Sequence, residues 1–425
     1  MSIQQNFPAI SPSLSLNFAR SKTLDPRITF TRTSSGTRTN ETGLVEVVPA
    51  NSPRFNHSYD PVSGTVRSLG LLVEESRVNS IRNNTMVGAS VGTSPTNWTP
   101  INRSGLTWSI TGTGIDSGVY YVDIRLSGTS NATSSPTFTF EEASQISASN
   151  GQTWSTSCFI KLVSGTTNGI TQIILAHDER SGTYLTGGNS DNFLSSINSS
   201  TTNIFSSCRY PFTRTNTNAS TTFLLPYLLV TPTNGAVIDM TLRIGMPQTE
   251  LGAFVTTVIP TSGSTVTRTA DNVSMIGENF SSWYNQSEGT IVSSWRMPTI
   301  PSSTVSMISS FSDGTTNNRF MHYKSEFGAN NLVRTSANGT SVNNSFGDII
   351  FNALSKTAFS YETGTTITSY NGSPANVVSQ SVPTSVNALY IGGSPSGITD
   401  GSVTFSQLTY YPRRLTNAQL ITLTR

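Results

Sequence analysis

Short runs of alternating apolar and polar residues recur along the whole chain, and Gly, Asn, Ser, Thr or Pro separate them. Early examples are residues 14–20 and 28–32, and later ones are residues 118–122 and 288–296. Alternation with a period of two predicts β-strands with one buried face. We found no long amphipathic helical pattern. The chain is therefore predicted to be all-β, with almost no helix.

The C-terminal stretch, residues 387–425, shows the pattern clearly. Two runs rich in β-branched and aromatic residues, 387–393 and 402–411, flank a Gly/Ser/Pro-rich turn. They predict a pair of antiparallel strands. Thr416 followed three residues later by Gln419 is a capping-box pattern, which predicts one short helix.

Changes in the pattern divide the chain into three blocks. Residues 1–82 contain a Pro/Ser/Gln-rich arm and a small β-rich module, too poor in strands for its own sandwich, so we expect it to pack on another block or on a partner. Residues 83–275 and 276–425 each predict an antiparallel β-sandwich, and Asn371-Gly372 predicts a hairpin in the second. The expected fold is two antiparallel β-sandwiches in series after the N-terminal module.

Composition excludes several classes of protein. Charged residues are 11% of the 425 residues, against roughly 25% in an average domain, while aromatic residues reach 9%. The aromatic content and a net charge of only +2 favour a folded chain over a disordered one. Such a small net charge provides no long-range field for nucleic acid or anionic membranes.

Neither membrane insertion nor classical secretion is expected. No apolar run approaches the ~18 residues that span a bilayer. The first residues lack a basic stretch followed by an apolar core, so we expect no signal peptide. We expect synthesis in a cytoplasm and, for a protein that acts outside, release by another route such as assembly into a particle.

The titratable residues do not form a recognisable catalytic or metal motif. His57, His177 and His322 fall in three different blocks without metal-ligand spacing. Residues 177–180, His-Asp-Glu-Arg, are the densest charged group in the middle of the chain. We interpret them as a solvated loop, with a metal or acid/base site as the alternative. We therefore predict no catalytic residue, no cofactor and no metal site.

Adjacent carboxylates are equally uninformative about catalysis. Glu74-Glu75 and Glu141-Glu142 would point to opposite faces of a strand, which does not suit glycoside hydrolysis. A structural ion pair between Glu74 or Glu75 and Arg77 is the preferred interpretation. Asp313 precedes a Gly and is read as a turn residue in preference to a calcium ligand.

Aromatic residues could form a sugar-stacking platform, although most Trp in a sandwich belong to the core. No individual residue is favoured as a ligand contact. The candidates are Trp98, Trp108, Trp154, Trp283, Trp295, Tyr370 and Tyr411.

Cys158 and Cys208 are too few for a disulfide framework. Two buried thiols are preferred, and whether the two cysteines pair stays open.

Several phrases resemble known modules. Residues 14–82 resemble an N-terminal module of bacteriophage virion proteins of the tail-fibre or head-fibre type. The matching phrases are Asp25-Pro26-Arg27-Ile28-Thr29-Phe30-Thr31-Arg32, Gly43-Leu44-Val45-Glu46, Pro53-Arg54-Phe55, Asp60-Pro61-Val62-Ser63-Gly64 and Leu71-Leu72-Val73-Glu74-Glu75-Ser76-Arg77-Val78-Asn79. Ser80-Ile81 departs from the Leu-Leu that usually follows.

The other two blocks resemble modules that accompany it. The middle block is similar to carbohydrate-binding-module jelly rolls of such phage proteins, and its closing phrases are Gln248-Thr249-Glu250-Leu251-Gly252, Val258-Ile259-Pro260-Thr261 and Arg268-Thr269-Ala270-Asp271. Val258 and Thr269 stand where Tyr and Ala are common. The last block resembles concanavalin-A/laminin-G-like jelly rolls, through Tyr370-Asn371-Gly372, Ile391-Gly392-Gly393 and Arg414-Leu415, so the resemblances imply two antiparallel jelly-roll β-sandwiches in series.

These resemblances imply a non-enzymatic structural protein of a bacteriophage virion, a tail fibre or adhesin that docks by its N-terminal part. Its expected partners are capsid, collar or tail proteins, further copies of itself (a trimer is favoured) and a host surface glycan. The C-terminal domain would be outermost. The alternative is a capsid decoration or head fibre. A polysaccharide-active enzyme is a second alternative, which would need an acidic pair on one concave face.

Overall fold

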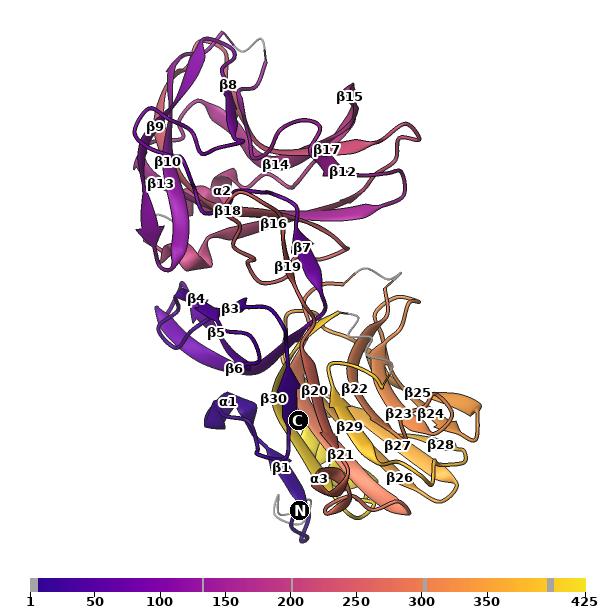
Figure 1. The fold of residues 1–425 in the computed structure, drawn as a ribbon. Coiled ribbons are helices and arrows are strands. Elements are labelled where there is room, and N and C mark those ends of the chain that lie inside the picture. Colours follow the sequence, from indigo (N-terminus) through magenta and orange to yellow (C-terminus); the bar gives the residue numbers. More distant parts are fainter. Residues whose placement is uncertain (1–6, 132–133, 200–201, 301–303, 396–400) are drawn as a thin grey trace.

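The computed structural model describes residues 7–131, 134–199, 202–300, 304–395 and 401–425. It confirms the all-β fold, with 52% of residues in strands and 6% in helices. The strands pair antiparallel and form two sandwiches stacked end to end (Figure 1). We call the lower one the base sandwich and the upper one the insert sandwich.

The base sandwich consists of two sheets built from both ends of the chain. The first sheet has the order β28 (Asn376–Ser379), β27 (Thr365–Tyr370), β26 (Ser355–Glu362), β21 (Glu288–Arg296), β30 (Ser402–Tyr411), β6 (Thr65–Glu74) and β5 (Arg54–Asp60), with β1 (Leu14–Leu16) also paired to β30. The second has the order β2 (Thr29–Thr31), β20 (Asn272–Ile276), β29 (Ala388–Ile391), β22 (Ser306–Ser312), β23 (Arg319–Lys324), β24 (Asn330–Ala337) and β25 (Thr340–Asp348). The N-terminal block thus adds strands to both sheets.

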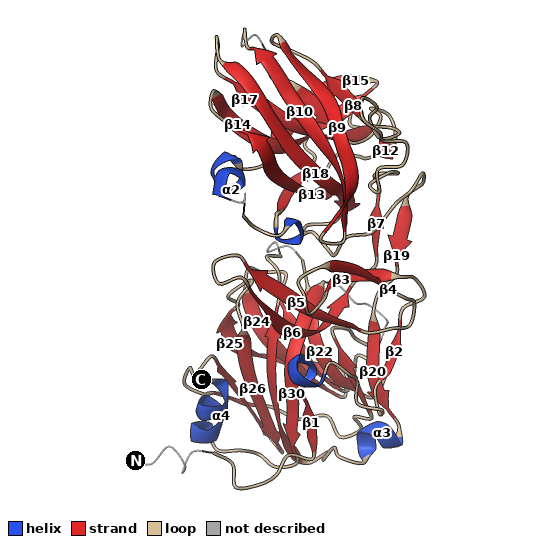
Figure 2. Cartoon of the chain, turned by 90° about the vertical axis from the view of Figure 1, so that its left-hand side faces the viewer, coloured by secondary structure: helices blue, strands red, loops and turns tan. Residues whose placement is uncertain are grey.

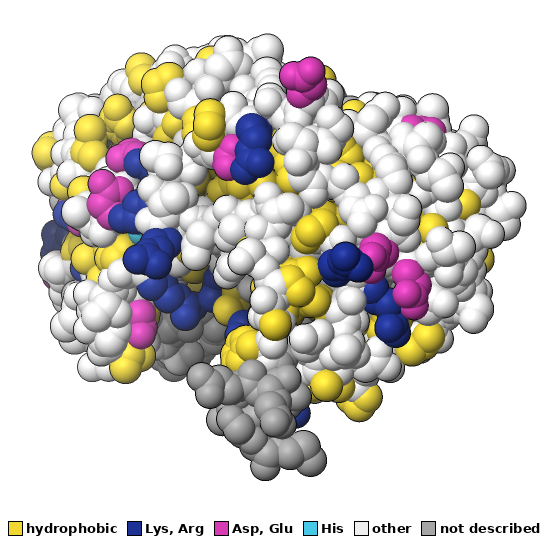
Figure 3. All heavy atoms as spheres, turned by 90° about the horizontal axis from the view of Figure 1, so that it is seen from below, with side chains coloured by type: hydrophobic (Ala, Val, Ile, Leu, Met, Phe, Trp, Pro, Cys, Tyr) yellow, Lys and Arg dark blue, Asp and Glu magenta, His cyan; other side chains and the backbone are white. Residues whose placement is uncertain are grey.

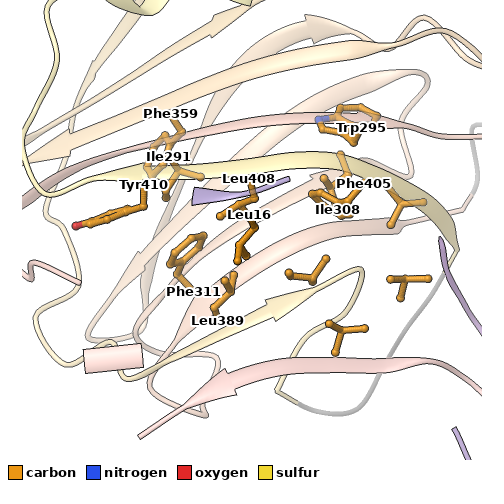
Figure 4. Close-up of a cluster of buried hydrophobic side chains, with 14 of the residues drawn as sticks. Leu16, Ile291, Trp295, Ile308, Phe311, Phe359, Leu389, Phe405, Leu408 and Tyr410 are labelled. Carbon is orange, nitrogen blue, oxygen red and sulfur yellow. The ribbon is translucent and has the colours of Figure 1, made fainter. Parts of the chain in front are cut away.

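The apolar positions of these alternating strands meet between the two sheets. Leu16 from the N-terminal block lies among Phe311 and Leu389 of one sheet and Leu408 and Tyr410 of the other (Figure 4). All five are buried. Because residues from both ends of the chain share this core, the N-terminal block and the C-terminal block are stabilised together.

The insert sandwich also has two sheets. One has the order β16 (Arg209–Thr215), β13 (Thr153–Gly165), β18 (Val237–Leu251), β10 (Val119–Thr129) and β9 (Leu106–Asp116). The other has the order β15 (Thr183–Asn189), β14 (Ile170–Ser181), β17 (Phe223–Pro232), β11 (Thr137–Thr139) and β8 (Thr99–Ile101), with β12 (Ile146–Ser147) paired to β17. Its core is separate from that of the base, and includes Trp108, Phe138 and Leu242.

The chain crosses between the sandwiches twice. It enters the insert along β7 (Arg77–Asn79) and returns along β19 (Val266–Arg268), and the two strands pair antiparallel. A small hairpin, β3 (Gly36–Thr39) with β4 (Val45–Val48), lies between the two sandwiches (Figure 2). The insert sandwich therefore interrupts the base sandwich in sequence. In space, strands from before and after the insert lie in the same two sheets of the base.

The helices are short. Among the described residues they are α1 (Phe18–Ser21), α2 (Leu194–Ser199), α3 (Glu278–Ser281), α4 (Asn417–Thr424) and one 3-10 turn, η2 (Phe205–Ser207). The predicted capping box is confirmed: the Gln419 N–H donates to Thr416 Oγ1, and the Thr416 N–H donates to Gln419 Oε1. Among the described residues, no helix has the length and apolar character needed to cross a bilayer.

The predicted pairing of the two closing strands is wrong. β29 lies in the second sheet of the base and pairs with β20 and β22, whereas β30 lies in the first sheet. Alternation identifies a strand but not its partner, and here the connection passes from one sheet to the other. The hairpin at Asn371-Gly372 is confirmed, since it joins β27 to β28 with positive φ at both residues.

Candidate binding site at the junction of the two sandwiches

A cavity of about 410 Å³ lies where the two sandwiches and the β3–β4 hairpin meet. Its walls come from the N-terminal block, the insert, the segment 255–258 that leads back from the insert, and the C-terminal block. We call it the junction cavity. Among the described residues, four arginines line it, Arg38, Arg67, Arg209 and Arg296, but only one carboxylate, Glu74.

The β3–β4 hairpin forms one wall because it is fastened to the insert. The Val45 N–H donates to Ser117 O at 3.0 Å, and Ser206 Oγ donates to Gly43 O at 2.5 Å. Val45 also packs on a small apolar cluster that contains Phe159. At Gly118, φ is +77° and an added Cβ would lie 1.8 Å from Val45 O, so this close approach requires glycine.

Beneath the cavity lies a cluster of buried charges, which we call the ion cluster. Its members are Arg32, Arg54, Glu74, Arg268 and Asp271, and their side chains are at most 2% exposed. Arg54 contacts both carboxylates, with 2.6 Å between its Nη1 and Glu74 Oε2. Arg32 Nη1 lies 3.0 Å from Asp271 Oδ1, and Arg268 Nε lies 3.6 Å from Glu74 Oε2. The cluster ties the N-terminal strands to the segment that returns from the insert.

Glu74 is held ionised by its surroundings. Burial opposes its ionisation, but Arg268 and Arg54 outweigh burial, and hydrogen bonds from the Thr257 N–H and Oγ1 add to their effect. Together they lower the pKa of Glu74 to about 2. A carboxylate that is already shared among two arginines and a threonine is unsuited to proton transfer, and no other carboxylate and no histidine lines the cavity among the described residues.

The cavity arginines differ from those of the ion cluster. Arg38 pairs with Glu46, 2.5 Å from its Nε, and Arg209 donates to Ser157 Oγ and Thr256 O. Among the residues that the structure describes, Arg67 and Arg296 have no carboxylate within ion-pair distance. Burial and the nearby charge of Arg67 both lower the pKa of Arg296. The cavity therefore carries an excess of positive charge.

Neutral polar and apolar groups complete the walls. Asn56, Ser58 and Asn352 place amide and hydroxyl groups at the cavity, while Leu69 and Met297 contribute apolar surface. A few polar groups that fix orientation, set among apolar surface, are typical of small-molecule sites of ~300–1,000 Å³. A second hollow of about 620 Å³ beside β7 contains Glu75 and Arg77, but these pair with each other at 2.5 Å.

The three histidines are buried far from one another. His57 lies in β5, His177 in the core of the insert and His322 in the core of the base. Burial lowers the pKa of His177 to about 3 and that of His322 to about 4, so both are neutral at pH 7. Among the described residues, no group of three or more His, Cys, Asp or Glu is placed to hold a metal ion.

Residues 177–180 lie in strand β14, so their interpretation as a loop is wrong. His177 and Glu179 are fully buried, whereas Asp178 and Arg180 belong to the alternate positions of the strand. Glu179 accepts hydrogen bonds from the Thr217 and Asn218 N–H groups, at 3.0 and 2.9 Å. Alternation places His177 and Glu179 on the buried face and Asp178 and Arg180, which pair at 3.4 Å, on the other face, so the four side chains do not converge on one site.

The predicted ion pair at Arg77 is confirmed, with 2.5 Å between its Nη2 and Glu75 Oε1. The prediction that Glu141 and Glu142 point to opposite faces is wrong. Both contact Arg82 Nη2, at 2.7 and 2.9 Å, because they follow β11 in a bend and not in a strand. Asp313 is a turn residue as predicted, and its Oδ1 accepts from the Thr315 N–H at 2.9 Å.

The aromatic candidates do not form an exposed platform. All five tryptophans are at most 5% exposed, Tyr370 is buried, and Tyr411 is half-buried. Cys158 and Cys208 are also buried, and each Sγ donates to a backbone carbonyl, of Gly245 and Ile204 respectively.

The five residues of the ion cluster all belong to the phrases that resemble phage modules. Arg32, Arg54 and Glu74 come from the N-terminal phrases, while Arg268 and Asp271 come from the passage that ends the middle block. In the sequence alone, these phrases have no structural role beyond the ion pair expected between Glu74 or Glu75 and Arg77. The structure gives one, because the separate phrases supply the charges of one buried cluster.

Comparisons with known proteins add no family. No family model matches the chain, and no curated protein matches it. Among solved structures, the botulinum neurotoxin serotype G binding domain matches with 13% identity and a TM-score of 0.30, over 36% of this chain and 40% of its own length. Domain 4 of the arabinanase AbnA from Geobacillus stearothermophilus, in complex with arabinotriose, matches with 16% identity and a TM-score of 0.29, over 37% of this chain and 73% of its own.

A third solved structure covers more of the chain. The CBM22 tandem domain of Paenibacillus barcinonensis Xyn10C matches with 9% identity and a TM-score of 0.25, over 79% of this chain and 98% of its own. At such low identities and TM-scores the comparisons do not place the chain in a family, and the functional conclusion depends on its own residues.

Proposed function

We propose that the chain is a non-enzymatic attachment protein of a bacteriophage particle, and that it binds host-surface saccharide in the junction cavity. The observation that carries the proposal is the make-up of that cavity. Amide and hydroxyl groups, arginines and apolar patches line about 410 Å³, and its one carboxylate is committed to the ion cluster. These groups can hold a polar ligand, but they offer no acidic pair for glycoside hydrolysis.

The surface is consistent with a protein that works outside a cell. Seen from the lower end, most of the molecular surface is neither hydrophobic nor charged, and the Lys/Arg and Asp/Glu side chains form small groups (Figure 3). A surface rich in hydroxyl and amide groups suits contact with saccharides, which present hydroxyl groups themselves. The virion assignment is supported by the module resemblance in the sequence.

The fold suggests how such a protein would be oriented. β1 directly follows the N-terminal arm and lies at the end of the base sandwich remote from the insert (Figure 1). An arm docked on a particle there would hold the base sandwich close to it and direct the insert sandwich outward. This orientation differs from the sequence-based expectation, in which the C-terminal block is outermost.

Two measurements test the proposal. Glycan-array binding by the purified full chain, followed by binding to host cells, tests attachment, and we expect saccharide-dependent binding without release of reducing sugar. Cryo-electron microscopy of purified particles tests the location, and we expect the chain on the head, collar or tail. Absence of the chain from particles would refute the virion role, and failure to bind any glycan or cell would refute attachment.

A further inference from the structure

Two arginines of the junction cavity stand out because they approach each other and neither forms an ion pair with a carboxylate among the described residues. Arg67 lies in β6 and Arg296 at the end of β21, and both line the cavity. Ser406 links their surroundings, since Arg296 Nη1 donates to Ser406 Oγ at 3.3 Å and that oxygen donates to Leu69 O at 2.8 Å. Like charges brought together at a partly buried site repel each other unless an anion lies near.

The hydrogen bonds of Arg296 also leave room for an anion. Its Nε is buried and finds no hydrogen-bond acceptor among the described residues. A guanidinium presents a planar fork of donors that matches a carboxylate with two parallel hydrogen bonds. Arg67 is exposed at the rim while Arg296 is half-buried in the wall, so the pair can receive a group from solvent.

The remaining walls indicate what is attached to that anionic group. Asn352 and Ser58 lie beside the two arginines with groups that can bond hydroxyls, and Met297 and Pro298 offer apolar surface for a C–H face. Arg209 faces the cavity from the insert, so a ligand longer than one sugar would contact both sandwiches. Phe159 is the only aromatic residue that lines the cavity among the described residues, which does not favour a stacked nucleobase.

We propose that Arg67 and Arg296 form a subsite for the carboxylate of an acidic saccharide, so that the junction cavity selects carboxylated glycans over neutral ones. This inference rests on the proposed attachment function and specifies its ligand class. Arg67 and Arg296 supply the charged contacts, and the amide and hydroxyl groups beside them contact the ring hydroxyls. Arg38 contributes less, because Glu46 already engages its charge.

The test uses the purified full chain and pairs of glycans that differ only in a carboxylate. An array of uronic-acid and sialic-acid glycans, each beside its neutral counterpart, selects the best binder, which is then titrated by calorimetry. We expect the carboxylated member to bind at least 10-fold more tightly than the neutral one. Arg67→Met and Arg296→Met should each weaken its binding about 10-fold or more, because a hydrogen bond to a charged group is lost.

Matched controls separate this inference from a general charge effect. Arg20→Met removes the same charge from an exposed position of helix α1 that does not line the cavity, and it should leave binding unchanged. Arg296→Lys keeps the charge but not the fork, and should restore only part of the affinity. Sodium sulfate at equal concentration should compete poorly, because it lacks the sugar ring.

Three results would overturn the ligand class while leaving glycan attachment intact. They are equal binding of the neutral counterpart, wild-type binding by Arg67→Met and Arg296→Met, and competition by sulfate as strong as by the glycan, which would mean a simple anion site. Failure to bind every glycan and every host cell would instead refute the proposed function itself. The two failures are therefore distinguishable.

Discussion

The junction between the two sandwiches contains two sets of arginines in opposite conditions. Arg54 in the ion cluster is fully buried and contacts two carboxylates, while Arg67 in the junction cavity is exposed and has no ion-pair partner among the described residues. The first set joins distant parts of the chain. In the second set, Arg67 and Arg296 are available to a ligand. An arginine therefore contributes to stability where the fold supplies its counter-charge. Where the fold does not, the arginine can contribute to binding.

The largest expected effect comes from removing a counter-charge in the ion cluster. Asp271→Asn leaves Arg32 and Arg54 buried beside a neutral amide, and we expect a loss of about 3–5 kcal/mol in the free energy of unfolding. Arg67→Met should change it by less than about 0.5 kcal/mol, as is usual for exposed positions. Urea denaturation followed by tryptophan fluorescence measures both, and equal effects would contradict the distinction between the two sets.

The next effect is on acid stability. The folded pKa of Glu74 is about 2, below its ordinary value of 4.5, so its contribution is fully present above pH 4.5 and is lost as the pH falls toward 2. At 1.36 kcal/mol per pKa unit, that contribution is on the order of 3 kcal/mol. Urea denaturation at pH values between 5 and 2.5 should show the loss in the wild type.

Two variants show whether the acid sensitivity of folding comes from the ion cluster or from the cavity. Glu74→Gln should be less stable at pH 7 and should lose most of the slope below pH 4.5, because the titrating group is gone. Arg296→Met should keep the wild-type slope, since no titrating carboxylate pairs with it. A wild-type slope in Glu74→Gln would assign acid sensitivity to other carboxylates.

A smaller effect is expected where the hairpin β3–β4 contacts the insert. Gly118→Ala places a Cβ 1.8 Å from Val45 O at a φ of +77°, and we expect a loss of about 1–2 kcal/mol. Gly151→Ala is a matched control with a φ of +80° and no atom within 4 Å of the added Cβ. Hydrogen exchange should show faster exchange of the Val45 N–H in Gly118→Ala alone.

This variant also tests whether the hairpin forms part of the binding site. Displacing the hairpin opens one wall of the junction cavity, and because Thr37 O and Val48 O of the hairpin accept from Arg54 and Arg32 of the ion cluster, part of its effect is a loss of stability. Saccharide binding should therefore weaken in Gly118→Ala more than its stability loss explains. Unchanged binding would mean that the hairpin is not part of the site.

The sequence predicts the strands of this protein better than their partners. Alternation located β30, but nothing local indicates that Leu14 pairs with Tyr410 or that Val403 pairs with Val73. Such pairings are decided by the shared core of the base sandwich, which joins residues almost 400 positions apart. The same limit explains why β29 and β30 were expected to pair.

The candidate site could be predicted from the sequence even less well than the strand pairing. Arg67 and Arg296 are each an ordinary arginine in a strand, and only the fold brings them to one cavity. The sequence did point to the regions that contain the ion cluster, because its members lie in phrases that resemble known modules. The chemical reason for those phrases could not be read locally, since Arg54 and Asp271 are 217 positions apart.

The smallest effect tests whether binding merely follows stability. Thr416→Ala removes the cap of helix α4, remote from the junction, and should cost about 1 kcal/mol in the free energy of unfolding. Thr422→Ala in the same helix is the control and should be nearly neutral, because Thr422 donates only to Ala418 O within the helix and alanine is the better helix former. Saccharide affinity should equal that of the wild type in both variants. A loss of affinity in Thr416→Ala would mean that the weakened binding of Gly118→Ala reports general destabilisation, and the junction cavity would then have to be established by Arg67→Met and Arg296→Met alone.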